Sequence, residues 1–180
     1  PAEQKIILYS GNIGEKQGLE SVIDAALQLS EHPWMFVIVG QGGGKARLEK
    51  MASERGLTNI RFFPLQSYEA LPALLKMGDC HLVVQKRGAA DAVLPSKLTN
   101  ILAVGGNAVI TAEAATELGQ LCNSYPGIAV CVEPESVPAL VTGIEQALAM
   151  PKENTVAREY AERTLEKENV LSQFIADIRG

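Results

Sequence analysis

The stretch WMFVIVGQGGGK, residues 34–45, decides the class of fold. It is an uninterrupted apolar run, rich in β-branched residues, that ends in a cluster of glycines. A short run of this kind is typical of a β-strand that other elements cover on both faces, and glycines let the chain turn tightly at its end. A helical spacing of apolar residues follows directly. The stretch therefore predicts one strand–loop–helix unit of a parallel sheet.

The same unit recurs along the chain, because short apolar runs alternate with longer segments of helical period. Right-handed crossovers between the strands then give an α/β fold, a Rossmann-like, doubly wound, parallel six-stranded sheet with helices on both faces. We expect residues 1–150 to form this single domain and residues 151–180 to form a charged helical tail that packs on it. The predicted strands are 5–10, 34–40, 60–63, 80–85, 108–111 and 128–132, and the predicted helices are about 17–30, 45–56, 68–77, 96–104, 114–123, 136–149 and 152–178.

The composition excludes several classes of protein. A net charge of -5 and a pI of about 5.1 leave no basic surplus, so we expect no nucleic-acid partner. The three cysteines, Cys80, Cys122 and Cys131, form no CxxC pair, which argues against a disulfide framework or a zinc site and favours a reducing compartment. Cys80 and Cys131 fall in predicted strands, and we interpret them as small apolar core residues. The chain has no transmembrane run and no signal-peptide pattern, and it begins at Pro1, as a piece of a longer protein would.

Ligands of doubly wound sheets bind beyond the carboxyl ends of the strands, where the strand order reverses. Two loops at that edge are rich in glycine, but neither carries a dinucleotide or ATP motif. GNIGEKQG, residues 11–18, lacks GxGxxG, and GQGGGK, residues 40–45, has no Ser or Thr after its lysine. Either loop could bring its backbone close to a ligand, or be a plain turn. The loops in which we expect function are 11–16, 40–44, 64–67, 86–97 and 111–116.

Residues typical of hydrolytic or metal catalysis are scarce. No Asp-x-Asp, HExxH or GxSxG motif occurs, so we predict no metal site. His32 precedes a proline at a turn and is interpreted as a solvated loop residue. His81 lies within an apolar strand and is interpreted as a buried core histidine.

A lysine in the first turn of a predicted helix is the most informative polar residue. The sequence LPSK, residues 94–97, follows the fourth strand, with Ser96 as the expected N-cap and Pro95 stiffening the entry. The helix dipole disfavours a cation here, unless an anion binds both the first-turn amides and the ammonium of Lys97. Lys16, together with Lys86 or Arg87, comes from neighbouring loops, so the pattern favours a diphosphate. The alternative is that Lys97 extends into solvent and has no role.

Four blocks of the sequence, in order and over nearly the whole chain, resemble a known family. The blocks are ILYSGNIGEKQGLESVIDAA, FVIVGQGGGKARLEKMA, IRFFPLQSYEALPALLKMGD and DAVLPSKLTNILAVGGNAVITA. They are similar to the C-terminal, nucleotide-sugar-binding half of GT-B retaining glycosyltransferases of family four, and most of all to the colanic acid biosynthesis glycosyltransferases. The resemblance implies metal-independent transfer from a nucleotide-diphosphate sugar, GDP-linked rather than UDP-linked, in bacterial exopolysaccharide biosynthesis.

The resemblance also implies partners and residue roles. The missing N-terminal domain would bind a lipid-linked saccharide acceptor, so this chain alone would transfer no sugar, and the full-length enzyme would be cytoplasmic, at the inner face of the membrane or free of it. Lys97 and Lys16 would be catalytic, by stabilising the departing diphosphate. Asp91 would reach the sugar hydroxyls, Asn100 the ribose, and residues 64–66 and 40–42 the base. The expected donor-binding residues are Gly11, Asn12, Gly14, Gly40, Gly42, Gln66, Arg87, Asp91, Pro95, Ser96 and Asn100.

The chain departs from the family pattern at several of these positions. The two glutamates of the family motif fall at Ala92 and Asn100, with Asp91 one position early. The motif lysine falls at Gln17, beside Lys16. These departures leave two other hypotheses open. One is a non-catalytic nucleotide-binding or regulatory α/β module, and the other is a dehydrogenase that binds NAD without the usual fingerprint.

Overall fold

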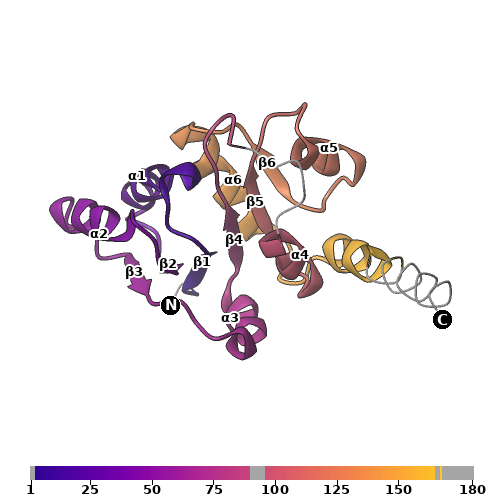
Figure 1. Cartoon of the computed structure of the whole chain (residues 1–180), viewed down its shortest axis with the longest axis horizontal. Helices are drawn as coiled ribbons and strands as arrows, with labels where there is room; N and C mark the ends of the chain where they lie inside the picture. Colours follow the sequence, from indigo (N-terminus) through magenta and orange to yellow (C-terminus); the bar gives the residue numbers. More distant parts are fainter. Residues whose placement is uncertain (1–2, 90–95, 165–166, 168–180) are drawn as a thin grey trace, which may run out of the picture.

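A computed structural model describes residues 3–89, 96–164 and 167 of the chain. Its centre is one sheet of six parallel strands in the order β3-β2-β1-β4-β5-β6 (Figure 1). This is the strand order of a doubly wound, Rossmann-like sheet, so the predicted fold class is confirmed. The strands are β1 (Lys5–Ser10), β2 (Trp34–Val39), β3 (Ile60–Phe63), β4 (Cys80–Val83), β5 (Ala108–Thr111) and β6 (Val130–Val132).

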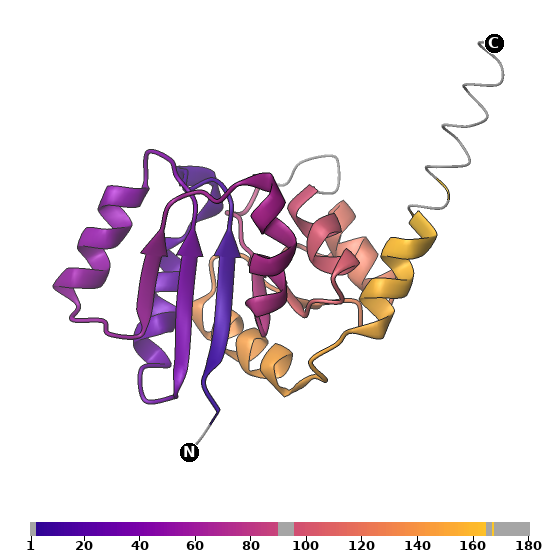
Figure 2. The same ribbon diagram turned by 90° about the horizontal axis from the view of Figure 1, so that it is seen from below.

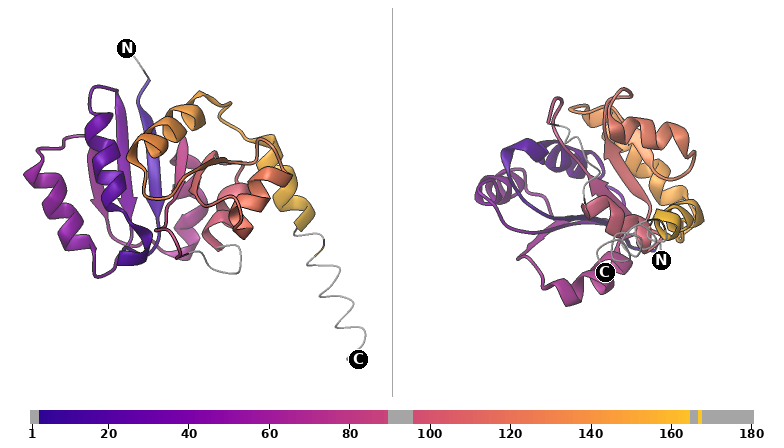
Figure 3. Two further views of the ribbon diagram at one scale, coloured as in Figure 1. Left: turned by 90° about the horizontal axis from the view of Figure 1, so that it is seen from above. Right: turned by 45° about the vertical axis from the view of Figure 1, so that its right-hand side comes forward.

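Helices cover both faces of the sheet (Figure 3) and enclose two apolar clusters. The first cluster joins the sheet to α1 (Glu20–Gln28), α2 (Lys45–Glu54) and α6 (Val137–Ala149). The second joins it to α3 (Leu71–Met77), α4 (Ser96–Ala103) and α5 (Glu117–Ser124). Figure 2 shows β1, β2 and β3 as parallel arrows, with helices behind them and beside them. Because β4 and β5 are buried along their whole length, their sequences are continuously apolar rather than alternating.

Local sequence explains where several elements begin and end. The hydroxyls of Thr116 and Ser136 accept hydrogen bonds from the third residue of α5 and α6, at 3.2 and 3.3 Å. The predicted helix 17–30 is split into a short 3₁₀ turn, η1 (Glu15–Gln17), and α1, because Gly18 lies between them with a φ of 62°. A second 3₁₀ turn, η2 (Tyr68–Ala70), precedes α3. The predicted strand 128–132 begins two residues late, at Val130.

The helical tail begins on the domain itself. Residues 155–164 are helical and lie beside α4 in Figure 1. The side chain of Asn154 starts this helix, since its Oδ1 accepts from the Ala157 N–H at 3.0 Å while its Nδ2 donates to the Gly127 carbonyl at 3.0 Å. Ala157 and Ala161 are buried in the second cluster. The rest of the predicted tail lies outside the described residues. Within the described part of the chain, every helix is too short or too polar to cross a bilayer.

One of the two strand cysteines differs from its interpretation. Cys80 is fully buried in β4, as a core residue should be. Cys131 in β6 is exposed, so its interpretation as a core residue is wrong. The reason is that β6 is the edge strand of the sheet, where the cover from α5 and α6 is incomplete.

His81 in β4 is buried, as its apolar sequence context predicted, with 1% of its surface exposed. Its ring lies between two glycines, because a Cβ on Gly78 or on Gly106 would approach ring atoms to 2.7 or 2.8 Å. The Nε2 atom has no hydrogen-bond partner among the described residues. Burial therefore lowers the pKa of His81 to about 4, because the charged imidazole would be desolvated.

This pKa predicts a loss of stability in mild acid. The unfolded chain binds a proton at His81 near pH 6.5, whereas the folded chain binds it only near pH 4, so stability falls as the pH falls between these values. We expect the free energy of unfolding to drop by about 2 kcal/mol from pH 7 to pH 5. Urea denaturation at the two pH values measures this, with His81→Leu as the control. An equal drop in wild type and variant would assign the pH dependence to other groups.

Candidate functional site

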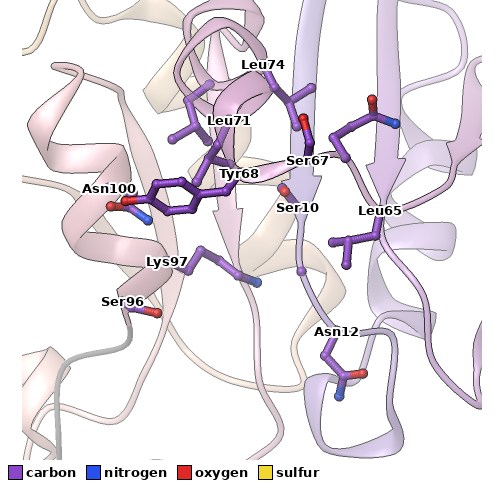
Figure 4. A pocket seen from close by; sticks show the side chains of 13 residues that line it. Ser10, Asn12, Leu65, Ser67, Tyr68, Leu71, Leu74, Ser96, Lys97 and Asn100 are labelled. Atoms are coloured by element: carbon purple, nitrogen blue, oxygen red, sulfur yellow. The ribbon is translucent and has the colours of Figure 1, made fainter.

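A cavity of about 530 Å³ opens beyond the carboxyl end of β1. It lies at the switch point of the sheet, where β1 has β2 on one side and β4 on the other. Three segments that are distant in sequence form its walls: residues 10–12 after β1, residues 65–75 after β3, and the first turns of α4 (Figure 4). The position agrees with the edge at which the sequence placed function.

Lys97 supplies the charge of the cavity. It is the second residue of α4, and Figure 4 shows its side chain reaching from the helix toward the end of β1. Its Nζ lies 3.8 Å from the centroid of the Tyr9 ring, a cation–π distance. The chain at Gly11 leaves room for it, since a Cβ there would meet the Lys97 Cε and Nζ at 2.9 Å. Burial lowers the pKa of Lys97 to about 8, so the ammonium is charged at pH 7 at some cost.

Tyr9 packs against the Lys97 ammonium at the end of β1, a role that the sequence did not predict. Its side chain is fully buried, and its hydroxyl donates to the Asn12 carbonyl at 2.5 Å. Burial raises the pKa of this phenol well above its usual value, so it remains neutral. Tyr9 thus fixes the loop after β1 and presents a π face to the ammonium. A strand tyrosine gives no sequence signal for this role, because strand positions favour aromatic residues anyway.

The opposite wall is apolar and partly open. Leu71, Leu74 and Leu75 of α3 line it with Leu65, and Tyr68 stands at the mouth with 83% of its surface exposed. Figure 4 shows the Tyr68 ring extending toward Asn100 of α4. The loop 64–67 that carries Leu65 was expected to be functional, but the part of the wall from α3 was not predicted, because a leucine-rich helix is usually a core element. A cationic floor facing an apolar wall suits a ligand with an anionic part and a flat, weakly polar part.

The glycines after β2 support the cavity from behind and do not line it. The N–H of Gly11 donates to the Val39 carbonyl and the N–H of Ile13 to the Gln41 carbonyl, both at 2.9 Å. A Cβ on Gly40 would lie 1.8 Å from the Gly11 carbonyl oxygen, and one on Gly42 would lie 2.3 Å from that of Ile13. The close approach of this backbone is therefore made to the loop after β1, and Gly40 and Gly42, which were expected to bind the donor, do not line the cavity.

Lys16 and Gly14 are close in sequence to residues that line the cavity, but neither of them lines it. Lys16 is exposed in η1, and its carbonyl accepts the Lys86 N–H at 2.9 Å. The Gly14 N–H donates to Oε1 of Gln17 at 3.0 Å, so the residue at the family's lysine position caps the turn. Of the two lysines expected to be catalytic, Lys97 lines the cavity and Lys16 does not.

The side chain of Arg87 forms ion pairs with acidic residues. Its guanidinium forms ion pairs with Glu113 and Glu133, both at 2.9 Å, and its N–H donates to Glu135 at 3.2 Å. It does not line the cavity. The acids come from the loop after β5, which is the neighbour of β4, and from the loop after β6, the next strand beyond it.

The remaining predicted residues divide into two groups. Asn12, Gln66 and Asn100 line the cavity, as does Ser96. Ser96 is the first residue of α4 as the structure describes it, and because the residue before it lies outside the described ranges, its role as the N-cap stays a prediction. Asp91 and Pro95 lie outside the described residues. Within the described ranges, no three His, Cys, Asp or Glu side chains gather in a way that could hold a metal ion.

Two known proteins are similar to this chain in sequence. The colanic acid biosynthesis glycosyl transferase WcaI of Escherichia coli strain K12 is 82% identical over 180 residues, which is all of this chain and 44% of that protein. The chain thus spans less than half the length of this relative. An α-D-kanosaminyltransferase of Streptomyces kanamyceticus is 32% identical over 80 residues, 43% of this chain and 21% of that one.

Solved structures share the fold at low identity. The glycosyltransferase WaaG, involved in lipopolysaccharide biosynthesis, matches with a TM-score of 0.69 at 21% identity over 90% of this chain and 44% of its own. Anabaena HepE in complex with UDP matches at 0.78 and 14%, over 98% of this chain and 50% of its own. The catalytic domain of the Helicobacter pylori cholesterol-α-glucosyltransferase matches at 0.70 and 17%, over 91% of this chain and 98% of its own.

The model of one protein family, described as glycosyl transferases group 1, matches residues 1–164. This match covers both the sheet and the start of the tail helix. The chain belongs to the group 1 glycosyl transferases.

Proposed function

We propose that the chain is the donor-binding half of a metal-independent, retaining glycosyltransferase, and that it holds the diphosphate of a nucleotide sugar in the cavity beside β1. The observation that carries the proposal is the position of Lys97, whose ammonium lies against the Gly11 backbone at the switch point of the sheet. The likeness to a colanic acid biosynthesis glycosyl transferase supports a role in exopolysaccharide synthesis.

Electrostatics explains how this site would assist transfer. The ammonium of Lys97 and the first-turn amides of α4 both create a positive electrostatic potential, and the ammonium is largely buried from water. A diphosphate binding there would be met by charge-assisted hydrogen bonds, and binding it would raise the pKa of Lys97 again. As the sugar leaves, negative charge grows on the diphosphate, and fixed donors stabilise it without reorganisation.

The apolar wall of the cavity would bind the nucleoside part of the donor. Leu65 and Tyr68 present apolar surface beside the amide of Gln66, and Asn100 faces the same space from α4. A base and a ribose have this mixture of flat apolar faces and hydrogen-bonding edges. The acceptor saccharide would be held by the part of the longer relative that this chain does not span.

Isothermal titration calorimetry with GDP, UDP and the matching nucleosides tests the proposal. We expect one diphosphate to bind at least about tenfold more tightly than its own nucleoside, because most of the proposed interaction is with the phosphates. Equal affinity for nucleoside and nucleotide would contradict a diphosphate site. Tighter binding of NAD than of any diphosphate would favour the dehydrogenase hypothesis.

Metal removal provides a separate prediction. Because Lys97 and backbone amides supply the positive charge, we expect the affinity for the diphosphate to change less than about twofold when EDTA replaces magnesium. The same calorimetric titration, run in both buffers, measures the difference. Loss of binding in EDTA and its return with magnesium or manganese would overturn metal independence.

A further inference from the structure

A second cavity, of about 220 Å³, opens at the amino end of β4. Its walls come from the end of α3, the turn between α4 and β5, and the linker that follows α6. Gly78, which precedes β4, and Gly106, which precedes β5, line it together with His81. Leu75 of α3 lines both this cavity and the one beside β1, so α3 separates the two. Its volume suits a small ion rather than a nucleotide.

An unpartnered polar atom lies at the wall of this second cavity. The His81 ring is 1% exposed, and its Nε2 has no hydrogen-bond partner within the described part of the chain. A Cβ on Gly78 would lie 3.0 Å from this Nε2, and a Cβ on Gly106 would lie 2.9 Å from it. The Nε2 end of the ring therefore points toward two glycines that line the cavity, and no side chain covers it there. A buried polar atom is costly without a partner, so a ligand that supplies one would bind favourably.

Two lysines place positive charge at the same cavity. Lys152 in the linker donates to Asp79 Oδ1 at 2.6 Å, but 65% of its side chain stays exposed. Lys76 is exposed in the last turn of α3 and forms no ion pair with another described residue. The two nearby acids are already engaged, since Asp79 also accepts a backbone N–H and Glu153 pairs with Arg158. Both ammonium groups thus keep N–H donors for an anion.

We infer that this second cavity is a binding site for inorganic phosphate, which hydrogen-bonds to Nε2 of His81 and to the ammonium groups of Lys76 and Lys152. Monohydrogen phosphate offers one O–H donor and several acceptor oxygens. Its O–H satisfies Nε2 where that nitrogen carries no proton, and one of its oxygens does so where it carries one. The other oxygens accept charge-assisted hydrogen bonds from the lysines. The imidazole stays neutral at pH 7, because burial lowers the pKa of His81 to about 4.

The bound ion would connect two parts of the fold. Lys76 belongs to the last turn of α3, and Lys152 belongs to the linker between α6 and the helix at 155–164. A phosphate held by both lysines would tie this linker to α3. Because such an ion binds the folded chain and not the unfolded one, phosphate should also raise the melting temperature.

Nuclear magnetic resonance of the histidine side chains tests the inference. Protein labelled with ¹⁵N-histidine is titrated at pH 7 with sodium phosphate, and in parallel with sodium chloride at matched ionic strength. The chain has two histidines, so exposed His32 is an internal control, and His81→Leu identifies the second set of signals. We expect phosphate to shift the Nε2 resonance of His81 along a saturable one-site curve, with His32 nearly unchanged. A shift that does not saturate, or an equal shift in chloride, would overturn the inference.

Lysine variants locate the ion. Lys76→Gln and Lys152→Gln, both at exposed positions, should each weaken the phosphate affinity by at least about threefold, whereas Lys50→Gln on α2 should leave it unchanged. Lys97→Met should keep the response of His81, since Lys97 lines the other cavity. Unchanged affinity in both cavity variants, or loss of the response in Lys97→Met, would place the ion elsewhere. None of these readouts depends on nucleotide binding, so the proposed function can fail without affecting this result.

Discussion

Gly40→Ala is expected to lower the free energy of unfolding by about 3–5 kcal/mol, the range of severe backbone conflicts. The new Cβ would lie 1.8 Å from the Gly11 carbonyl oxygen, and the φ of 155° at Gly40 is one that residues with side chains rarely adopt. The conflict is with backbone, which cannot rotate away as a side chain can. Relief would require the loops after β1 and β2 to separate, with loss of the hydrogen bond from Gly11 to Val39.

Gly43→Ala is the matched control in the same loop. A Cβ there would meet no atom within 4 Å, and the backbone of Gly43 is not in the positive-φ region. We expect the free energy of unfolding to change by less than about 1 kcal/mol, and toward greater stability, because alanine restricts the unfolded chain. Urea denaturation of both variants gives the comparison. Similar stability of the two variants would show that the loops are not held as closely as the structure has them.

The glycine loops show how much of the structure could be predicted from the sequence. Residues 34–45 predicted a strand followed by a tight turn, and both are present, whereas the close backbone approach considered for a ligand is made to the loop after β1. The partner of that approach could not be predicted, because it depends on the pairing of β1 with β2, which brings together residues about 29 positions apart. The sequence therefore located the loop correctly while the contact proved to be with another loop.

Arg87 illustrates a limit of a different kind. The topology of the predicted sheet brings all its carboxyl-end loops to one edge, and Lys16, Arg87 and Lys97 do follow strands β1 and β4. Which of them faces the cavity depends on the neighbours that compete for each charge. Glu113 and Glu133 engage Arg87, and both belong to loops after later strands. Attraction between residues so distant in sequence leaves no local pattern, so it was not predictable from the segment itself.

Lys97→Met is expected to have opposite effects on binding and on stability. Methionine keeps a flexible apolar stem but has no charge. Affinity for the nucleoside diphosphate should fall by about 1.5–3 kcal/mol, which is the usual contribution of a hydrogen bond to a charged group. The unliganded protein should become more stable by about 1–2 kcal/mol at pH 7, because the burial that lowers the pKa of Lys97 to about 8 makes its charge costly.

The pH dependence of the wild type checks the same cause. Unfolded lysine titrates near 10.5 and folded Lys97 near 8, so between these values only the unfolded state keeps the proton, and the wild-type stability contributed by this group rises with pH. Diphosphate affinity should fall over the same range as the ammonium is lost. In Lys97→Met neither trend should remain. Lys50→Met, at an exposed position on α2, serves as the control, since it removes a surface charge and with it only an exposed ion pair with Glu54 at 3.7 Å.

The two measurements separate a functional lysine from a structural one. If the contact of Lys97 with the Tyr9 ring served mainly to hold α4 on the sheet, the methionine variant would lose that cation–π interaction and unfold more easily. If Lys97 instead binds an anionic ligand, the methionine variant should be more stable without ligand, because the buried charge of Lys97 is then poorly solvated. Calorimetry and urea denaturation of the same two proteins therefore decide the matter. Lower stability with unchanged diphosphate affinity would remove Lys97 from the binding site, and higher stability with weakened affinity would keep it there.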